Sequence, residues 1–125
     1  MSRLYKRYGR AGVECQRNCR ERHIDPAKVA RAKIRRHGTA GGAQVWIIDG
    51  GYVRSAFDIE FALGSHDAHS KFIPPGEIWV EDLAPADLRA LIAHEGHERQ
   101  LMLKGATYAK AHASANRVEA KLRRK

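Results

Sequence analysis

The spacing of hydrophobic residues changes near Pro85, from alternation upstream to a helical repeat downstream. Upstream, β-branched and aromatic residues flank an Asp-Gly-Gly turn at residues 49–51, which is the signal of a β-hairpin. Phe57, Ile59 and Phe61 then alternate with polar or small residues, as in a half-buried strand. This part of the chain therefore predicts short antiparallel strands.

A further short strand is expected at EIWVE, residues 77–81. Pro-Pro-Gly precedes it and Asp82 follows it, which suits a short strand at the edge of a sheet. The segment GSHDAHSKFIPPG, residues 64–76, separates this strand from the preceding ones and is expected to form a loop.

Two helices are expected to follow. The first covers Pro85–Lys104, because proline suits a first helical turn and Gly105 suits the position after the last one. The second begins after Thr107, a plausible N-cap, and reaches about Leu122. Their short connection predicts antiparallel packing. The sequence thus predicts an α+β fold, in which a small, mostly antiparallel sheet over residues 44–81 packs on a C-terminal antiparallel helical hairpin.

The positive charge of the chain is concentrated in its first third. Residues 1–40 hold twelve of the 23 Lys and Arg but only three of the 14 Asp and Glu, so they carry the whole net charge of +9. The glycines of GTAGG, residues 38–42, mark a joint. Asp25-Pro26 is a helix start signal, and a helix is expected over Lys28–Arg36. The chain therefore predicts a basic, partly helical arm, residues 1–40, attached to an α+β body, residues 41–125.

The basic arm predicts an anionic partner. Its Lys and Arg, with Tyr5 and Tyr8 among them, suit contacts to nucleic-acid phosphates, although no groove-reading motif is present. An acidic protein partner, or a solvated arm without a partner, fits the same composition. No apolar run exceeds the four residues Val45–Ile48, so neither a membrane span nor a signal peptide is expected, and the protein is expected in the cytoplasm.

Ionisable residues stand on helix faces that should be buried. In the first helix Glu95 falls within the apolar stripe, and His94 and Glu98 lie side by side on its flank, one turn apart. In the second helix His112 and Glu119 lie on the inner face. Burial of such a charge costs on the order of several kcal/mol unless it is paired or binds a metal. The pattern indicates either a metal site or a buried polar network.

The residue types suit zinc, which accepts imidazole nitrogens and carboxylate oxygens and keeps one position for water in catalytic sites. His94 and Glu98 would be ligands from successive turns, and His112 would be the third ligand. Glu95, directly after the first histidine, would act as general base on the metal-bound water. Tyr108, one turn before His112, could donate a hydrogen bond to a developing oxyanion.

The alternative is a salt-bridge network that clamps the helical hairpin. Arg99 follows Glu95 by four residues, so these two can pair without a metal, and Glu98 and His112 can join them. Glu119 is expected either as a fourth metal ligand or as the partner of a ligand.

Other candidate ligands carry weaker signals. Cys15, Cys19 and His23 share one helical face, but they are too few for a complete metal site, and two cysteines make no disulfide framework. His66 and His69 could contact a metal or a substrate, although exposed loop histidines are common.

The segment EIWVEDLAPADLRALIAHEGHE, residues 77–98, resembles the core of zincin-type metallopeptidases, especially small ones of the ImmA/IrrE type. In that family an edge strand leads into a helix bearing HExxH, and the third ligand lies on a later helix. The resemblance covers about residues 77–119. It implies a zinc ligand at His94, the general base at Glu95, and a downstream glutamate ligand at Glu119.

Glu98 stands where the family motif has its second histidine, and His97 lies one position too early. The body, with its DGGYVRS and FIPPGEIWVED segments, also resembles a group of small uncharacterised proteins of bacteria and their phages, which implies no activity. Two hypotheses follow. One is a zinc-dependent, peptidase-like hydrolase. The other is a non-enzymatic accessory protein, cytoplasmic or virion-associated, whose residues 1–40 bind nucleic acid or an acidic protein.

Overall fold

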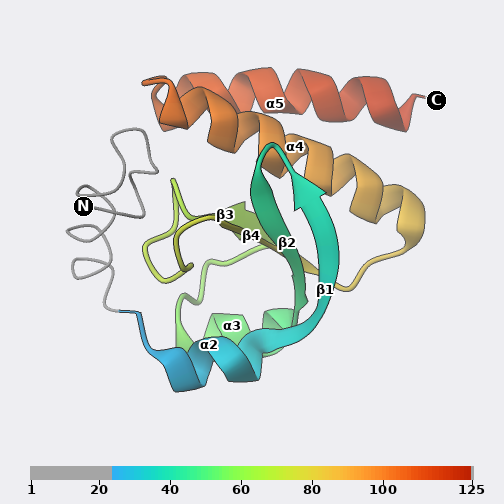
Figure 1. Cartoon of the computed structure of the whole chain (residues 1–125). Helices are drawn as coiled ribbons and strands as arrows, with labels where there is room; N and C mark the ends of the chain where they lie inside the picture. Colours follow the sequence, from blue (N-terminus) through green and yellow to red (C-terminus); the bar gives the residue numbers. More distant parts are fainter. Residues whose placement is uncertain (1–23, 125) are drawn as a thin grey trace.

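The structure, a computed structural model, describes residues 24–124. Its helices and strands follow one another as α2 (Pro26–Ala32), β1 (Lys33–Ala40), β2 (Ala43–Ile48), α3 (Gly50–Ala56), β3 (Gly64–His66), β4 (Glu77–Glu81), α4 (Pro85–Leu103) and α5 (Tyr108–Arg123). Within these residues the strands form one sheet in the order β1-β2-β4-β3, and only the β2–β4 pair is parallel. The predicted α+β fold, with a mostly antiparallel sheet and a C-terminal helical pair, is confirmed (Figure 1).

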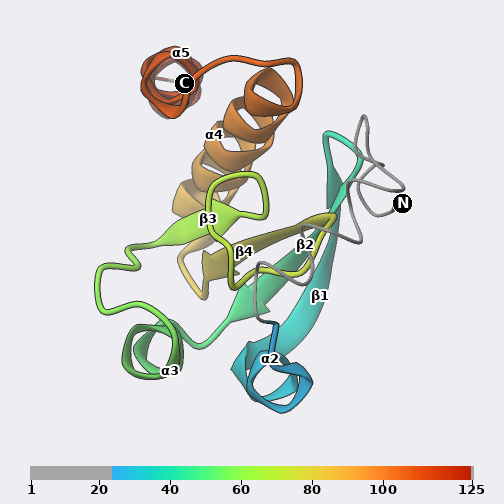
Figure 2. The same cartoon turned by 90° about the vertical axis from the view of Figure 1, so that its left-hand side faces the viewer.

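Helices cover both faces of the sheet, with α2 and α3 on one side and α4 on the other (Figure 2). Val45 and Ile47 of β2 pack in one apolar cluster with Leu88 of α4. Ile48 of β2 and Trp79 of β4 belong to a separate cluster with residues of α2 and α3. Successive side chains of a strand point to opposite faces. The run VWII therefore supplies both cores, rather than one half-buried face.

The two C-terminal helices begin and end where the sequence predicts, within one residue. Pro85 occupies the first turn of α4, and Gly105 takes a φ of +106° in the connection, a value that glycine adopts readily. Thr107 caps α5 by accepting a hydrogen bond from the Lys110 backbone N–H at 3.2 Å. The helices run antiparallel, and α5 lies on α4, away from the sheet (Figure 2).

The predicted hairpin turn at residues 49–51 is wrong. Asp49 instead caps α3, and its carboxylate accepts a hydrogen bond from the Tyr52 backbone N–H at 3.0 Å. The hairpin lies earlier, between β1 and β2, where Gly41 and Gly42 take φ values of +55° and +82°. An Asp-Gly pair suits a helix start as well as a turn, and the pairing of β2 with β1 decides between them.

The strand predicted over Phe57–Phe61 is also wrong, because this segment is a connection of turn and coil. Phe57 stacks on Phe72 with ring centroids 5.0 Å apart, and Phe61 is buried, but Ile59 is 79% exposed. The aromatic residues therefore pack on Phe72 of another loop and on the core beneath the sheet, which includes Trp79 of β4, without forming a strand themselves.

Two further predictions need correction. The helix expected over Lys28–Arg36 ends at Ala32, and strand β1 begins at Lys33. The strand at Glu77–Glu81 is present, but it lies between β2 and β3 and not at an edge. Both errors have the same cause: strand pairing over long sequence distances outweighs local propensity.

Part of the basic segment is built into the fold. Val29 and Ala32 of α2 are buried in the core on the α2–α3 side, and β1 completes the sheet. Cys15, Cys19 and His23 lie outside the described residues.

Candidate metal centre

A cleft of about 410 Å³ lies between α4, α5, β3 and the loop that precedes β3. Its lining includes every residue that the sequence predicts for the site: His94, Glu95, Glu98, Tyr108, His112 and Glu119. They meet because α4 and α5 run antiparallel with these faces opposed, while β3 packs beneath α4 (Figure 2).

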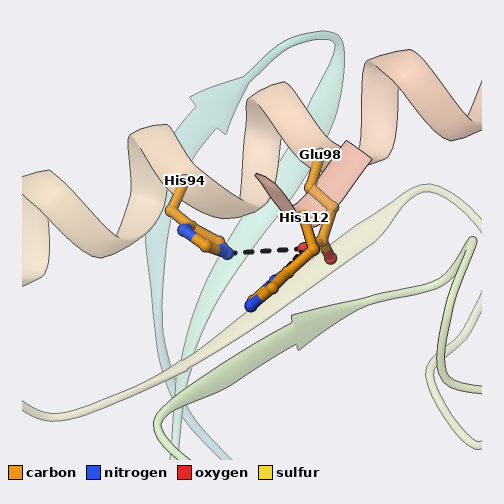
Figure 3. A group of neighbouring side chains, drawn as sticks. All are labelled: His94, Glu98 and His112. Carbon is orange, nitrogen blue, oxygen red and sulfur yellow. Dashed lines mark hydrogen bonds and ion pairs between the residues drawn. The ribbon is translucent and has the colours of Figure 1, made fainter. Parts of the chain in front are cut away.

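The side chains of His94, Glu98 and His112 point toward one another (Figure 3), and all three line the cleft. One ligand-type atom from each lies within 4.8 Å of the other two. On α4, His94 and Glu98 stand one turn apart, with 3.4 Å between Nε2 and Oε2. From α5, His112 places its Nδ1 2.8 Å from the same Oε2. These three donors can hold a metal ion.

Glu98 is the hub of the site. Its Oε1 accepts a hydrogen bond from His66 Nε2 at 2.7 Å, while its Oε2 faces His112 and His94. Burial alone would raise the pKa of Glu98, but hydrogen bonds from His66, His94 and His112 hold that pKa far below its ordinary value. Glu98 is therefore a fully ionised carboxylate, which is the form that binds metals.

Glu95 has the opposite electrostatics. It is 5% exposed and makes no hydrogen bond to the described residues. Burial raises its pKa to about 8, and the nearby charge of Glu98 acts in the same direction. Without a metal, the Glu95 carboxyl therefore carries a proton at neutral pH. Two carboxyl groups in one site whose pKa values are pushed apart are typical of acid–base machinery, and a bound cation would favour the ionised form of Glu95.

Glu119 lies behind His94 and not beside the other ligands. One of its oxygens is 2.9 Å from His94 Nδ1, the nitrogen opposite to the one that faces Glu98. The two atoms are within ion-pair distance but outside hydrogen-bond geometry. Although burial lowers the pKa of His94, its hydrogen bond to Glu98 and the carboxylates around it raise that pKa overall. This placement favours Glu119 as the partner of a ligand.

Tyr108 stands at the wall of the cleft between two imidazoles. Its ring stacks on His69 with centroids 3.9 Å apart and on His112 with centroids 5.2 Å apart. Its hydroxyl lies 3.4 Å from His112 Nδ1. Burial, then the charges of Glu98 and Glu95, raise the pKa of Tyr108, so the hydroxyl keeps its proton and remains a donor.

His66 is the functional candidate that sequence reasoning undervalued. It is fully buried, and with Glu95 and Glu98 it forms a second group whose ligand-type atoms lie within 4.8 Å. Within GSHDAH it reads as an exposed loop histidine. Its inward direction comes from the pairing of β3 with β4, opposite Ile78, and no local pattern predicts that pairing.

The salt-bridge network that the sequence allows does not form as expected. Arg99 pairs with Asp67 of the loop after β3, through Nε and Oδ1, and not with Glu95. His97 is half-buried between the helices, where its Nε2 lies 2.8 Å from Ser114 Oγ. Glu98 and His112 do contact each other. Within residues 24–124, Glu95 therefore forms no ion pair with a Lys or Arg.

Comparisons with known proteins supply no family for this arrangement. No protein-family model, no curated protein and no solved structure matches the chain. Among residues 24–124, no helix has the length and apolar character needed to cross a membrane. The chemistry of the site must therefore be argued from its own geometry.

Proposed function

We propose that the protein is a zinc-dependent hydrolase of the zincin type, with His94, Glu98 and His112 as the zinc ligands and a peptide as substrate. The convergence of these three donors on one cleft, beside a buried carboxyl group with no other partner, is the observation that carries the proposal. Two imidazoles and one carboxylate form a donor set that zinc accepts and that leaves a position for water.

A bound zinc ion would supply Lewis acidity, making its water a nucleophile near neutral pH and polarising a carbonyl. Glu95 then accepts the proton of the attacking water and passes it to the leaving group. A group that accepts and then donates a proton works best when its pKa lies near the working pH. The pKa of Glu95 is about 8 without a metal, and a nearby cation would lower it toward that range. Tyr108 donates its hydroxyl proton in a hydrogen bond to the developing oxyanion.

The form of the cleft supports a peptide substrate. The strand at its wall, β3, is at the edge of the sheet, and Gly64 and Ser65 of that strand line the cleft. An edge strand offers backbone N–H and C=O groups to an extended chain. A Cβ at position 64 would lie 3.1 Å from Trp79 O of β4, so the close approach of β3 to β4 favours glycine here.

The proposal is tested by metal analysis and peptide hydrolysis with the purified full chain. We expect about one zinc ion per chain, lost in His112→Ala. Glu95→Gln should retain zinc and lose about 10²–10⁴-fold in hydrolysis of a mixed peptide library, because the amide keeps the shape but accepts no proton. An absence of zinc from the wild type would contradict the whole proposal. Zinc binding without hydrolysis would contradict the enzymatic part alone.

A second candidate function is nucleic-acid binding through the basic segment. Within the described part of the chain, Lys28, Arg31 and Arg36 are exposed on α2 and β1. Removal of residues 1–40 would delete strand β1, so charge substitutions give the better test. Changing these three residues to Gln should weaken binding of a DNA duplex and flatten its dependence on salt.

The matched control changes three exposed cations to Gln: Lys104, which follows α4, and Lys110 and Arg117 of α5. An equal loss of DNA binding in both triple variants would show that only total charge matters and would contradict a specific role for the basic segment.

A further inference from the structure

His66 occupies a position set by the register of the sheet. It is the last residue of β3 and pairs with Ile78 of β4. Ile78 packs in the apolar cluster on the α4 side, so His66, directly across the pair, also faces α4. The imidazole is completely buried and meets Glu98 beneath the cleft.

The contacts divide the two oxygens of Glu98 between separate neighbours. Oε1 lies 2.7 Å from His66 Nε2. Oε2 lies 2.8 Å from His112 Nδ1 and 3.4 Å from His94 Nε2. Oε2 therefore faces the two other donors of the proposed zinc site, and Oε1 faces His66.

The proton on His66 is fixed by its surroundings. A metal-binding carboxylate has only lone pairs to offer, so in the 2.7 Å contact with Oε1 His66 Nε2 is the donor. Its Nδ1 is buried and has no hydrogen-bond partner among the described residues. His66 is thus a hydrogen-bond donor aimed at one oxygen of Glu98.

We propose that His66 is a positioning residue that makes Glu98 a metal ligand of defined geometry, an inference that rests on the proposed zinc site. An imidazole offers one nitrogen in a fixed direction, but a carboxylate can rotate and bind an ion through either oxygen or both. By engaging Oε1, His66 leaves Oε2 as the single donor. The pair of His66 and Glu98 thereby takes the place of the second histidine that the chain lacks in HEGHE. Partners of this kind typically change metal affinity by about 10–100-fold.

The neighbouring Asp67–Arg99 ion pair provides a control that separates an effect on metal binding from an effect on stability alone. Asp67, next to His66, pairs with Arg99, next to Glu98, and its Oδ2 also accepts a hydrogen bond from the Gly76 backbone N–H at 2.9 Å. The His66–Glu98 and Asp67–Arg99 contacts both join the end of β3 to α4, but only the first involves a proposed ligand. Loss of the Asp67–Arg99 pair should weaken the fold without changing the coordination of the metal.

The experiment measures zinc affinity by competition with a chelator, and the visible spectrum of the cobalt-substituted protein, for the full chain. His66→Leu should lose about 10–100-fold in zinc affinity and change the cobalt spectrum. His66→Gln, whose amide N–H reaches about as far as Nε2–H, should recover most of both. Arg99→Gln should keep the wild-type affinity and spectrum despite lower thermal stability.

The outcomes separate this inference from the proposed function. If the wild type binds no zinc, both are overturned. If it binds zinc and His66→Leu binds equally well with an unchanged spectrum, only the role of His66 is overturned. Two ions per chain, with the second lost in His66→Gln, would also overturn it, because His66 would then be a ligand. Should His66→Leu not fold, a crystal structure of the zinc-loaded wild type decides, and His66 must donate to Oε1 and stay off the metal.

Discussion

The two halves of α4 lie against the same face of the sheet with opposite chemistry. In the first half, Leu88 and Leu91 pack on apolar residues of β2 and β4. In the second half, Glu95 and Glu98 are buried, and Glu98 meets His66 of β3. One helix and one sheet face therefore hold an ordinary core and a cluster of ionisable groups, separated by a single helical turn.

The difference separates the part of α4 that stabilises the fold from the part that carries the candidate site. Each fully buried aliphatic side chain contributes about 1.5–3 kcal/mol to folding. Buried carboxylates and imidazoles gain little or cost free energy, because lost hydration offsets their mutual attraction. Five carboxyl groups line the cleft, and the described residues of its wall include no Lys or Arg: Asp58, Glu60, Glu95, Glu98 and Glu119. A bound cation would reduce the repulsion among these carboxyl groups. If they served only the structure, their burial would still cost free energy.

The largest effect is expected in the apolar half. Ile47 is completely buried against α4. Ile47→Ala should lower the free energy of unfolding by about 2–5 kcal/mol, because the site cannot collapse around the missing methyl groups. Urea unfolding in the presence of EDTA measures the loss. The folded variant should still bind zinc with wild-type affinity. A parallel loss of zinc affinity would show that the two halves of α4 are coupled.

The next largest effect is expected from zinc itself. At a free concentration about 100-fold above its dissociation constant, zinc should stabilise the wild type by about 2.7 kcal/mol, because it binds the folded state. His112→Ala should lose this gain, since it removes the donor from α5. Without a metal, the substitution should still cost about 1–3 kcal/mol, because it removes the hydrogen bond of His112 to the buried Glu98, so the metal-free stability is measured separately in EDTA. Equal stabilisation of both proteins by zinc would place the ion elsewhere.

The sequence predicts the ionisable half of α4 better than it predicts the strands that position that half. The helical repeat from Pro85 onward is local, so the faces of His94, Glu95 and Glu98 follow from spacing alone, and the short connection brings His112 to them. The burial of His66 and the pairing of Arg99 with Asp67 depend on the position of β3 beside β4. That position is a tertiary property, which alternation of residue types does not encode.

The same lesson holds upstream. Asp49 followed by glycines is a sound turn signal, and it becomes a helix cap because β2 already has β1 as its antiparallel neighbour. Phe57, Ile59 and Phe61 alternate as a strand would, yet two of them pack on loop residues and the third is exposed. In these segments the local pattern identifies a turn signal and buried aromatic residues, but long-range contacts decide whether the backbone forms a helix, a strand or a loop.

A smaller effect is expected from the carboxyl group that carries the raised pKa. In the metal-free protein, folded Glu95 holds its proton up to about pH 8, whereas the unfolded chain releases it near its ordinary value of 4.5. The folded state therefore binds more protons between these values, and the stability of the wild type should fall as pH rises through this window. Glu95→Gln removes this dependence. At pH 8 in EDTA it should be more stable than the wild type by at least about 1 kcal/mol, and near pH 4.5 the difference should vanish.

Unfolding of both proteins in urea across pH 4.5–8 measures the effect, with Glu60→Gln as a control at an exposed glutamate. A difference that is constant with pH would show that Glu95 is not held in its protonated form by burial.

The smallest effect is expected at the histidine nearest in sequence to the missing ligand of the HExxH motif. His97 lies between His94 and Glu98 in the chain but points to α5, where it contacts Ser114 Oγ at 2.8 Å. His97→Ala should cost about 0.5–1.5 kcal/mol of stability, the usual net contribution of one hydrogen bond. It should leave zinc affinity and the cobalt spectrum unchanged, because the imidazole faces the helix interface and does not line the cleft. His94→Ala, three residues earlier on the same helix, should abolish zinc binding. If His97→Ala weakened zinc binding as strongly as His94→Ala, the ligand set would be wrong, and the metal would lie on the α5 side of α4.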